Sequence, residues 1–353
     1  MNIEDLISAA NPLPTAAAPG TDSARARQTL QRVLAEAEPT NSRPGRRRSR
    51  LIFAGLVATG AAALVIALIV PGESGRHRPS LGSRTLSGAL GKLALVALSQ
   101  PPAQPPGPGQ FQYTDSRSLS SSQTFDSPKI FYTVTFRLHR QIWIGSNGSG
   151  RIKESPSHPH FLTAKDRARW IAAGRPSLGI RPTDERFGPH QLTLGPVNLF
   201  KLPTNPARLA AVLTARKIES GPPGPAEDFV QIGDLLRETD APPALRASLF
   251  KVAERLPGVR LLGSVTDRAG RKGIGIAYIS HLPKDKYPGQ YGKSELIFDP
   301  KTSALLGEQT VLVNARTRTS TVTAWTVYLK SGVVDSVTST KLVSGRSAAA
   351  GPA

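Results

Sequence analysis

The residues that could do chemistry are few and scattered. His158 and His160 form the closest pair of imidazoles, and two histidines at this spacing can share a metal ion. The pair lies in a stretch rich in proline and serine, and the sequence does not bring His139, His190 or His281 beside it as a third ligand. This spacing therefore does not predict a metal site.

The acidic residues do not form a catalytic pair. Asp184-Glu185 and Glu227-Asp228 are neighbours in the chain, and adjacent side chains diverge, so neither pair directs two carboxyl groups at one substrate. The absence of cysteine excludes disulfides, thiolate ligands and cysteine nucleophiles. Because no nucleophile elbow, phosphate-binding loop or His-Glu-x2-His pair occurs either, we expect a protein that is not an enzyme and needs no cofactor.

A binding groove is the remaining kind of site. A curved sheet with helices over its concave side can enclose an apolar groove, which aromatic and aliphatic side chains of the strands would line. The alternative is that the same side chains are ordinary core. The candidate lining residues are Phe111, Tyr113, Tyr132, Val134 and Phe136.

Residues 51–70, LIFAGLVATGAAALVIALIV, form an uncharged apolar run. A helix of about 20 such residues crosses the hydrocarbon core of a bilayer, so we expect one transmembrane helix. A cleaved signal peptide is the main alternative, but the apolar region would be unusually long and no Ala-x-Ala site follows Val70.

A cluster of arginines immediately before this run indicates its orientation. Positive charge accumulates on the cytoplasmic side of membrane helices, so we expect the N-terminus inside the cell and the larger part outside it, in a single-pass protein of the cell membrane. The cluster consists of Arg43, Arg46, Arg47, Arg48 and Arg50.

Within the expected span, small residues recur at every fourth position. Gly55, Thr59, Ala63 and Ala67 would share one helix face and allow a second helix to approach closely, which would permit a homodimer. The alternative is that small residues are simply common in membrane helices.

The net charge of +20 lies mostly beyond the span. Outside the cell this excess makes nucleic acid an unsuitable partner, whereas anionic lipid headgroups and acidic wall polymers would be attracted to it. The alternative is that the arginine content reflects a GC-rich genome.

The order of sequence patterns predicts five regions. These are a cytoplasmic segment, 1–50, with one amphipathic helix; the transmembrane helix, 51–70; a Pro/Gly-rich linker with a short helix, 71–109; an extracytoplasmic domain, 110–343; and a disordered tail, 344–353.

The outer domain reads as strands, then helices, then hairpin-linked strands. The clearest strand is 131–144, in which apolar and polar residues alternate with Arg140 as the one break, and Asn147-Gly148 then supplies a hairpin turn. This order predicts an α+β fold, an antiparallel curved sheet like a half-barrel with helices on one face. The expected helices are 164–173, one opened by Asn205-Pro206, 226–238 and 243–256, and the other expected strands are 111–117, 259–267, 274–280, 294–298, 305–314, 321–330 and 333–337.

Several stretches together resemble a known family. QFQYTDSRS, IWIGSNGSGRI, LIFDPKTSALLGEQTVLV and SGVVDSV, with the region from DFVQIGDLL to GRKG, are similar to uncharacterised actinobacterial single-pass membrane proteins. Genes of that family often lie beside those of extracytoplasmic-function sigma factors, so the resemblance implies a regulatory partnership with a cytoplasmic sigma factor. The outer layout is distantly similar to the half-barrel of lipoprotein carriers, an analogy of fold alone.

Two functions remain open at this point. The first is a sensor or regulator whose outer domain binds a lipid-like or envelope ligand while the inner segment contacts a cytoplasmic protein. The second is a tethered carrier or envelope-binding module whose inner segment serves only as an anchor. Deletion of residues 1–42 would abolish signalling in the first and leave the second intact.

Overall fold

A computed structural model describes residues 85–103, 105–127, 130–189, 199–215, 224–237, 241–282 and 288–347. The expected span, the arginine cluster before it, the stripe of small residues within it and the cytoplasmic helix all lie outside these ranges. Among the helices of the described ranges, none combines the length and the apolar character needed to cross a membrane.

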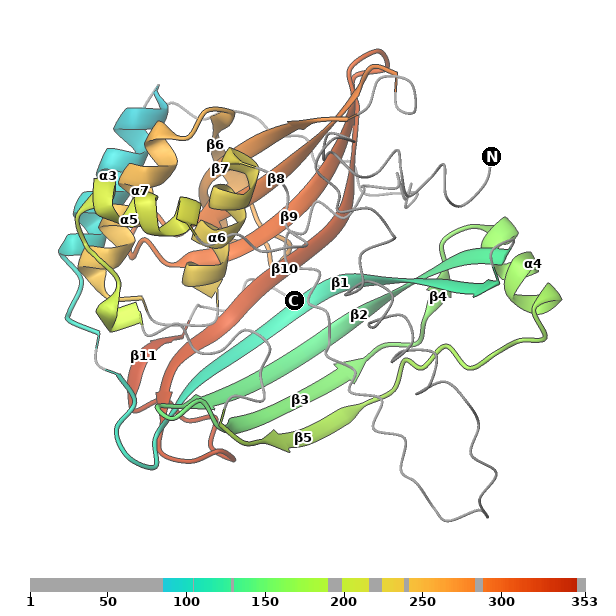
Figure 1. Ribbon diagram of the computed structural model, residues 1–353, viewed down its shortest axis with the longest axis horizontal. Helices are drawn as coiled ribbons and strands as arrows, with labels where there is room; N and C mark the ends of the chain where they lie inside the picture. Colours follow the sequence, from blue (N-terminus) through green and yellow to red (C-terminus); the bar gives the residue numbers. More distant parts are fainter. Residues whose placement is uncertain are drawn as a thin grey trace, which may run out of the picture. The chain divides into compact units, whose positions relative to one another are not determined.

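The described residues form an α+β domain on one open antiparallel sheet, which confirms the expected class (Figure 1). The order is β5-β3-β2-β1-β10-β9-β8-β7-β6, with β4 also paired to β2 and β11 to β10, which makes 11 strands. The strands are β1 Phe111–Ser127, β2 Ile130–Gly145, β3 Gly150–Pro156, β4 His160–Phe161, β5 Thr183–Phe187, β6 Val259–Thr266, β7 Lys272–His281, β8 Gln290–Phe298, β9 Leu305–Asn314, β10 Thr319–Val334 and β11 Ser344–Ser347.

The hairpin of β2 and β3 follows the sequence pattern closely. Strand β2 keeps its alternation, and Arg140, the break in it, lies with its Nε 3.6 Å from Glu154 Oε1 of β3. The loop after β2 turns at Asn147-Gly148 as expected: Asn147 Oδ1 accepts from the Ser149 amide at 2.9 Å, and Gly148 has a φ of +78°. Such a left-handed conformation favours glycine.

Strand β10 joins the two halves of the sheet. It pairs with β9 through Thr319–Val327 and with β1 as far as Phe111↔Val334. Two separate strands were expected here, 321–330 and 333–337, but β10 continues through Gly332 to Val334.

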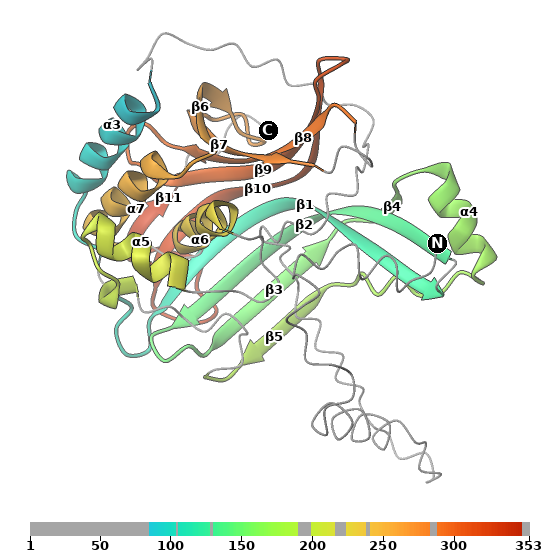
Figure 2. The ribbon, with the colours of Figure 1, turned by 45° about the horizontal axis from the view of Figure 1, so that its top comes forward.

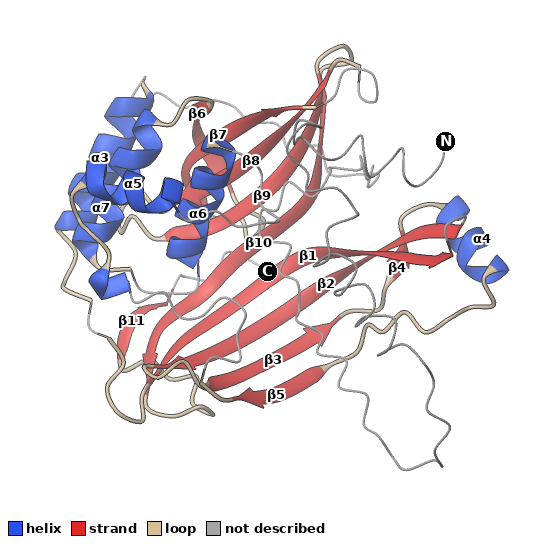
Figure 3. Ribbon diagram, viewed as in Figure 1, coloured by secondary structure: helices blue, strands red, loops and turns tan. Residues whose placement is uncertain are grey.

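Four helices gather beside strands β6–β10 (Figure 2). They are α3 Leu86–Leu98, α5 Pro206–Ala215, α6 Pro225–Arg237 and α7 Pro243–Arg255. Their apolar side chains and those of the strands form the main core, in which Phe250 and Phe298 meet edge to face at 5.0 Å between ring centroids. Helix α4, Ala164–Ala172, lies apart, at the start of β2 (Figure 3).

Two expected boundaries are corrected by this packing. Helix α3 belongs to the main core through Leu90, Leu93 and Ala97, because α3 packs against α7, so the folded domain starts before 110 and α3 is not part of a linker. The expected disordered tail is also wrong at its start, since residues 344–347 form β11 and pair with β10.

The helix starts agree with the sequence signals. Asn205 Oδ1 accepts from the amides of Ala207 and Arg208 at 3.1 Å, and Pro206 occupies the first position of α5. Thr163 Oγ1 accepts from the Asp166 amide at 3.1 Å at the start of α4. These side chains satisfy amides that have no partner inside the helix.

Candidate functional site

The five candidate groove residues lie on opposite faces of the sheet. We call the face against which α3, α5, α6 and α7 pack the helix-side face, and the opposite one the outer face. Residues that lie opposite each other on paired strands share a face. Tyr328 of β10 belongs to the main core and lies opposite Ser116 of β1, which lies opposite Arg140 of β2. The even-numbered residues of β2 therefore lie on the helix-side face. Tyr132, Val134 and Phe136 therefore lie there, whereas Phe111 and Tyr113 lie on the outer face and cannot line the same groove.

On the helix-side face, apolar side chains of β2 and β3 form what we call the apolar strip. None of the described residues of the main core comes from β1, β2 or β3. Four of the five strip residues keep part of their surface exposed, and only Ile142 is fully buried. The strip consists of Phe136, Leu138, Ile142, Ile144 and Ile152.

The apolar strip has polar neighbours. Strand β1 contributes Ser116, Ser118 and Ser120 beside it, and the largely buried pair of Arg140 and Glu154 lies within it. From Phe136 to Ile144 the strip extends about 26 Å along β2, at roughly 3.3 Å per residue. A long apolar surface with hydroxyls and one ion pair can bind a molecule that has an extended hydrocarbon part and a polar end.

Tyr113 and Trp143 form a buried aromatic pair on the outer face, with ring centroids 5.0 Å apart. The guanidinium carbon of Arg151 lies 5.3 Å from the Trp143 ring centre, and Arg151 Nε donates to Asp184 Oδ1 at 2.7 Å. The chain after β10 crosses this pair, since Trp143 Nε1 donates to the carbonyl of Ser339 at 2.7 Å. The pair is therefore structural core beneath a C-terminal segment.

A polar row adjoins this aromatic pair. Gln141 Nε2 donates to Tyr113 Oη at 2.6 Å, and His139 Nε2 lies 2.8 Å from Asp115 Oδ1. Burial, and after it the negative charge of Asp115, raises the pKa of Tyr113 to about 12. Tyr113 thus stays a neutral phenol over the physiological range.

The histidines do not complete a catalytic or metal site in the described ranges. Ser155 faces His139 across β2 and β3, but its hydroxyl makes no hydrogen bond to the imidazole, so the geometry of a serine triad is not formed. His158 and His160 are exposed, and His190 lies outside the described residues. Among the described residues, no group of three or more histidine, aspartate or glutamate side chains could hold a metal ion.

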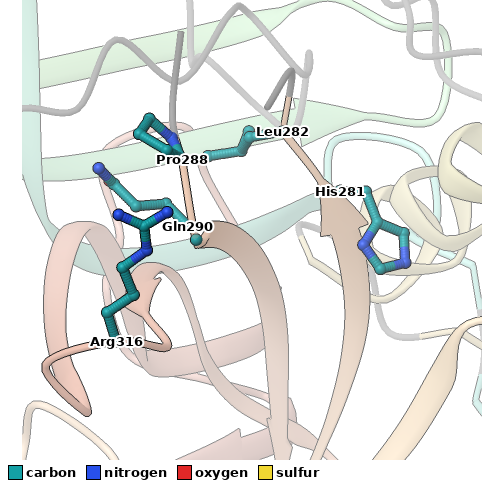
Figure 4. A pocket seen from close by; sticks show the side chains of 6 residues that line it. His281, Leu282, Pro288, Gln290 and Arg316 are labelled. Atoms are coloured by element: carbon teal, nitrogen blue, oxygen red, sulfur yellow. The ribbon is translucent and has the colours of Figure 1, made fainter. Parts of the chain in front are cut away.

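A surface cavity of about 550 Å³ lies where β7 ends and β8 begins (Figure 4). In this view Arg316 and Gln290 lie side by side, and His281 lies on the neighbouring strand. The residues that line the cavity are His281, Leu282, Pro288, Gly289, Gln290 and Arg316. The cavity contains none of the candidate groove residues, and its lining combines the polar His281, Gln290 and Arg316 with apolar surface.

No protein-family model matches the chain, and no curated protein is significantly similar to it. The candidate site is therefore defined only by the geometry of the described residues.

The sequence pattern contained part of this site. Alternation along β2 places Leu138, Ile142 and Ile144 with Phe136, whereas Ile152 joins them only through the pairing of β2 with β3. The same pairing brings Arg151 to Trp143, and no local signal in the sequence reveals that contact.

Proposed function

We propose that this protein is a membrane-anchored, non-enzymatic binding protein, with residues 51–70 as its anchor and the described domain outside the cell. The domain acts as a half-barrel that senses a lipid-like molecule. The observation that supports this proposal most strongly is the apolar strip, a row of partly exposed aliphatic and aromatic side chains outside the main core.

A hydrocarbon ligand suits the apolar strip for a physical reason. Each square ångström of apolar surface removed from water contributes about 25 cal/mol, so an acyl chain covering several of these residues gains several kcal/mol. The pair of Arg140 and Glu154 would meet the polar end of such a molecule. An elongated amphiphile thus fits the strip better than a compact polar metabolite.

The inner segment supplies the regulatory half of the proposal. The family resemblance supports a cytoplasmic sigma factor as partner, which residues 1–50 would contact. The second function, a tethered carrier of lipid or envelope polymer, would use the same apolar strip without this partner.

The ligand proposal is tested by mass spectrometry of lipids extracted from the purified full chain. Phe136→Glu introduces a charge into the apolar strip and should lower the amount of co-purified lipid at least tenfold. Leu95→Glu is the control, because Leu95 is 69% exposed on α3. This variant should leave the amount of co-purified lipid unchanged. Equal lipid in all three proteins would overturn the role of the strip.

The anchor and the regulatory role have separate tests. Extraction of cell membranes with alkaline carbonate should leave the full chain in the membrane pellet and release a variant without residues 51–70. Deletion of residues 1–42 should abolish the transcriptional response that the sigma factor gives when the outer domain binds its ligand. Retained lipid transfer without any transcriptional response would favour the carrier.

A further inference from the structure

The strand pairing collects positive charge on the outer face of β1, β2, β3 and β5. Arg117 pairs with His139, Lys153 pairs with Gln141, and Arg186 pairs with Arg151, so these cations share one face. Arg137 lies two residues before His139 on the same face of β2. We call Arg117, Arg137, Lys153 and Arg186 the basic face.

All four side chains of the basic face are exposed. None of them forms an ion pair within the described part of the chain. The two acidic residues of this face already have partners, since Asp184 pairs with Arg151 and Asp115 with His139. The pKa of Asp184 is lowered by Arg151 and further by Lys153, which lies opposite it, and by Arg186, so Asp184 offsets part of this charge. The face still keeps an excess of cations, because Arg151 and the four residues of the basic face stand against only Asp115 and Asp184.

The helix-side face of the same strands differs in charge. Over the residues whose side chains the structure describes there, β1 carries no charged residue, and the others carry Arg140, Glu154 and Glu185. Arg140 and Glu154 pair with each other. The excess of cations is thus a property of one face, which a uniform arginine-rich composition would not produce.

The dimensions of the basic face suit a flat partner. Four neighbouring strands about 4.8 Å apart give a width of roughly 15 Å, and like-facing residues along a strand are about 6.6 Å apart. Arginines and lysines spread over such an area can each contact a different headgroup of a lipid surface. A narrow groove for a single polymer strand is not part of this geometry.

We infer that the basic face docks on the anionic phospholipid headgroups of the membrane in which the chain is anchored. This inference rests on the proposed function, because it requires the domain to be tethered to that membrane. Residues 71–84 can span at most about 50 Å at roughly 3.6 Å per residue, so the described domain stays within that distance of the anchor and close to the bilayer. Docking by the basic face would leave the helix-side face, with its apolar strip, turned away from the surface.

The experiment measures energy transfer between the basic face and the bilayer. Because the chain contains no cysteine, Ser155→Cys gives a single labelling position, exposed and opposite His139 on the outer face. The labelled full chain is incorporated into lipid nanodiscs that carry an acceptor dye on a few headgroups. Discs of neutral phosphatidylcholine are compared with discs in which about 30% is phosphatidylglycerol.

We expect high transfer efficiency in anionic discs and low efficiency in neutral discs. Near 1 M salt the Debye length falls to about 3 Å, so the difference should disappear. Arg117→Gln with Arg137→Gln should reduce the docked fraction on the order of tenfold, and lysines at both positions should restore it.

A charge-matched control separates the basic face from net charge. Arg208→Gln with Arg255→Gln removes two exposed arginines from helices α5 and α7 and should leave transfer unchanged. Equal loss in both double variants would overturn the inference, as would equal transfer in neutral and anionic discs. Binding of soluble polyglutamate without transfer in anionic discs would also overturn it and assign the face to an acidic polymer.

Failure of the proposed anchor has a different readout. A chain that does not enter any nanodisc contradicts the membrane anchor itself. A chain that enters the discs but shows no dependence on lipid charge contradicts only the docking of the basic face.

Discussion

At the scale of single residues, Arg237 links helix α6 to the sheet. Its guanidinium Nη2 lies 2.6 Å from Glu308 Oε2 of β9 and also pairs with Asp234, and Tyr328 Oη donates to Glu308 at 2.9 Å. Burial alone would lower the pKa of Arg237, but Glu308 and the other nearby groups raise it well above its usual value. Arg237 therefore stays charged inside the fold.

Loss of this arginine should be costly. Arg237→Met leaves Glu308 in a largely buried site without its cation, so we expect the free energy of unfolding in urea to fall by about 3 kcal/mol. Arg208→Met, at an exposed arginine, should change it by less than about 0.5 kcal/mol. Adding Glu308→Gln to Arg237→Met should recover part of the lost free energy of unfolding. If Arg237→Met alone lowers the free energy of unfolding by less than about 1 kcal/mol, this account is contradicted.

Tyr113 gives a prediction in alkali. Its pKa is raised to about 12 in the folded protein, against about 10 for an unfolded tyrosine, so the stability that it contributes is complete below pH 10 and is lost as the pH rises toward 12. Absorbance of phenolate should show that Tyr113 titrates later than an exposed tyrosine. The chain contains six tyrosines, so the absorbance of Tyr113→Phe is subtracted from that of the wild type to isolate the titration of Tyr113. A midpoint of this difference near pH 10 would refute the prediction.

At the scale of elements, helix α3 offers a matched pair of leucines. Leu93 is fully buried in the main core, whereas Leu95, two positions later, is 69% exposed. We expect Leu93→Ala to lower the free energy of unfolding by roughly 2–5 kcal/mol and Leu95→Ala to have almost no effect. Equal effects in urea unfolding followed by circular dichroism would mean that α3 does not pack as described.

Elements with strong local patterns could be predicted from the sequence, and weakly patterned ones could not. The alternation along β2 and the Asn205-Pro206 start of α5 are local signals, and both match the structure. Strand β5, TDERF, lacks apolar alternation, and the second half of β1 is mostly polar, so both were missed. These polar strands form because a neighbouring strand satisfies their backbone groups.

The candidate site was only partly predictable for a related reason. Period-two spacing identifies which residues of one strand share a face, as for Val134 and Phe136. It does not relate the faces of two strands, so the placement of Tyr113 opposite them followed only from the pairing of β1 with β2. The packing of α3 against α7 is likewise a long-range contact without a local signal.

At the scale of the whole described domain, β10 connects two groups of strands. On one side lie β1, β2, β3 and β5, and on the other lie β6 to β9. A chain that ends after Asn314 keeps the described helices and nine of the strands but lacks this connection. We expect it to lose cooperative unfolding in urea and to be cleaved rapidly by protease, whereas a chain that ends after residue 347 should behave like wild type.

The position of β10 also affects the timing of folding. Phe111 of β1 pairs with Val334, so the middle of the sheet joins residues from the two ends of the described domain. A ribosome delivers residues in order, and the first-made strand must wait with one edge open until the last long strand has emerged. Under the proposed location of this domain outside the cell, export during synthesis would carry most of it across the membrane before its sheet can close. In that interval the cell must prevent aggregation of the open edge.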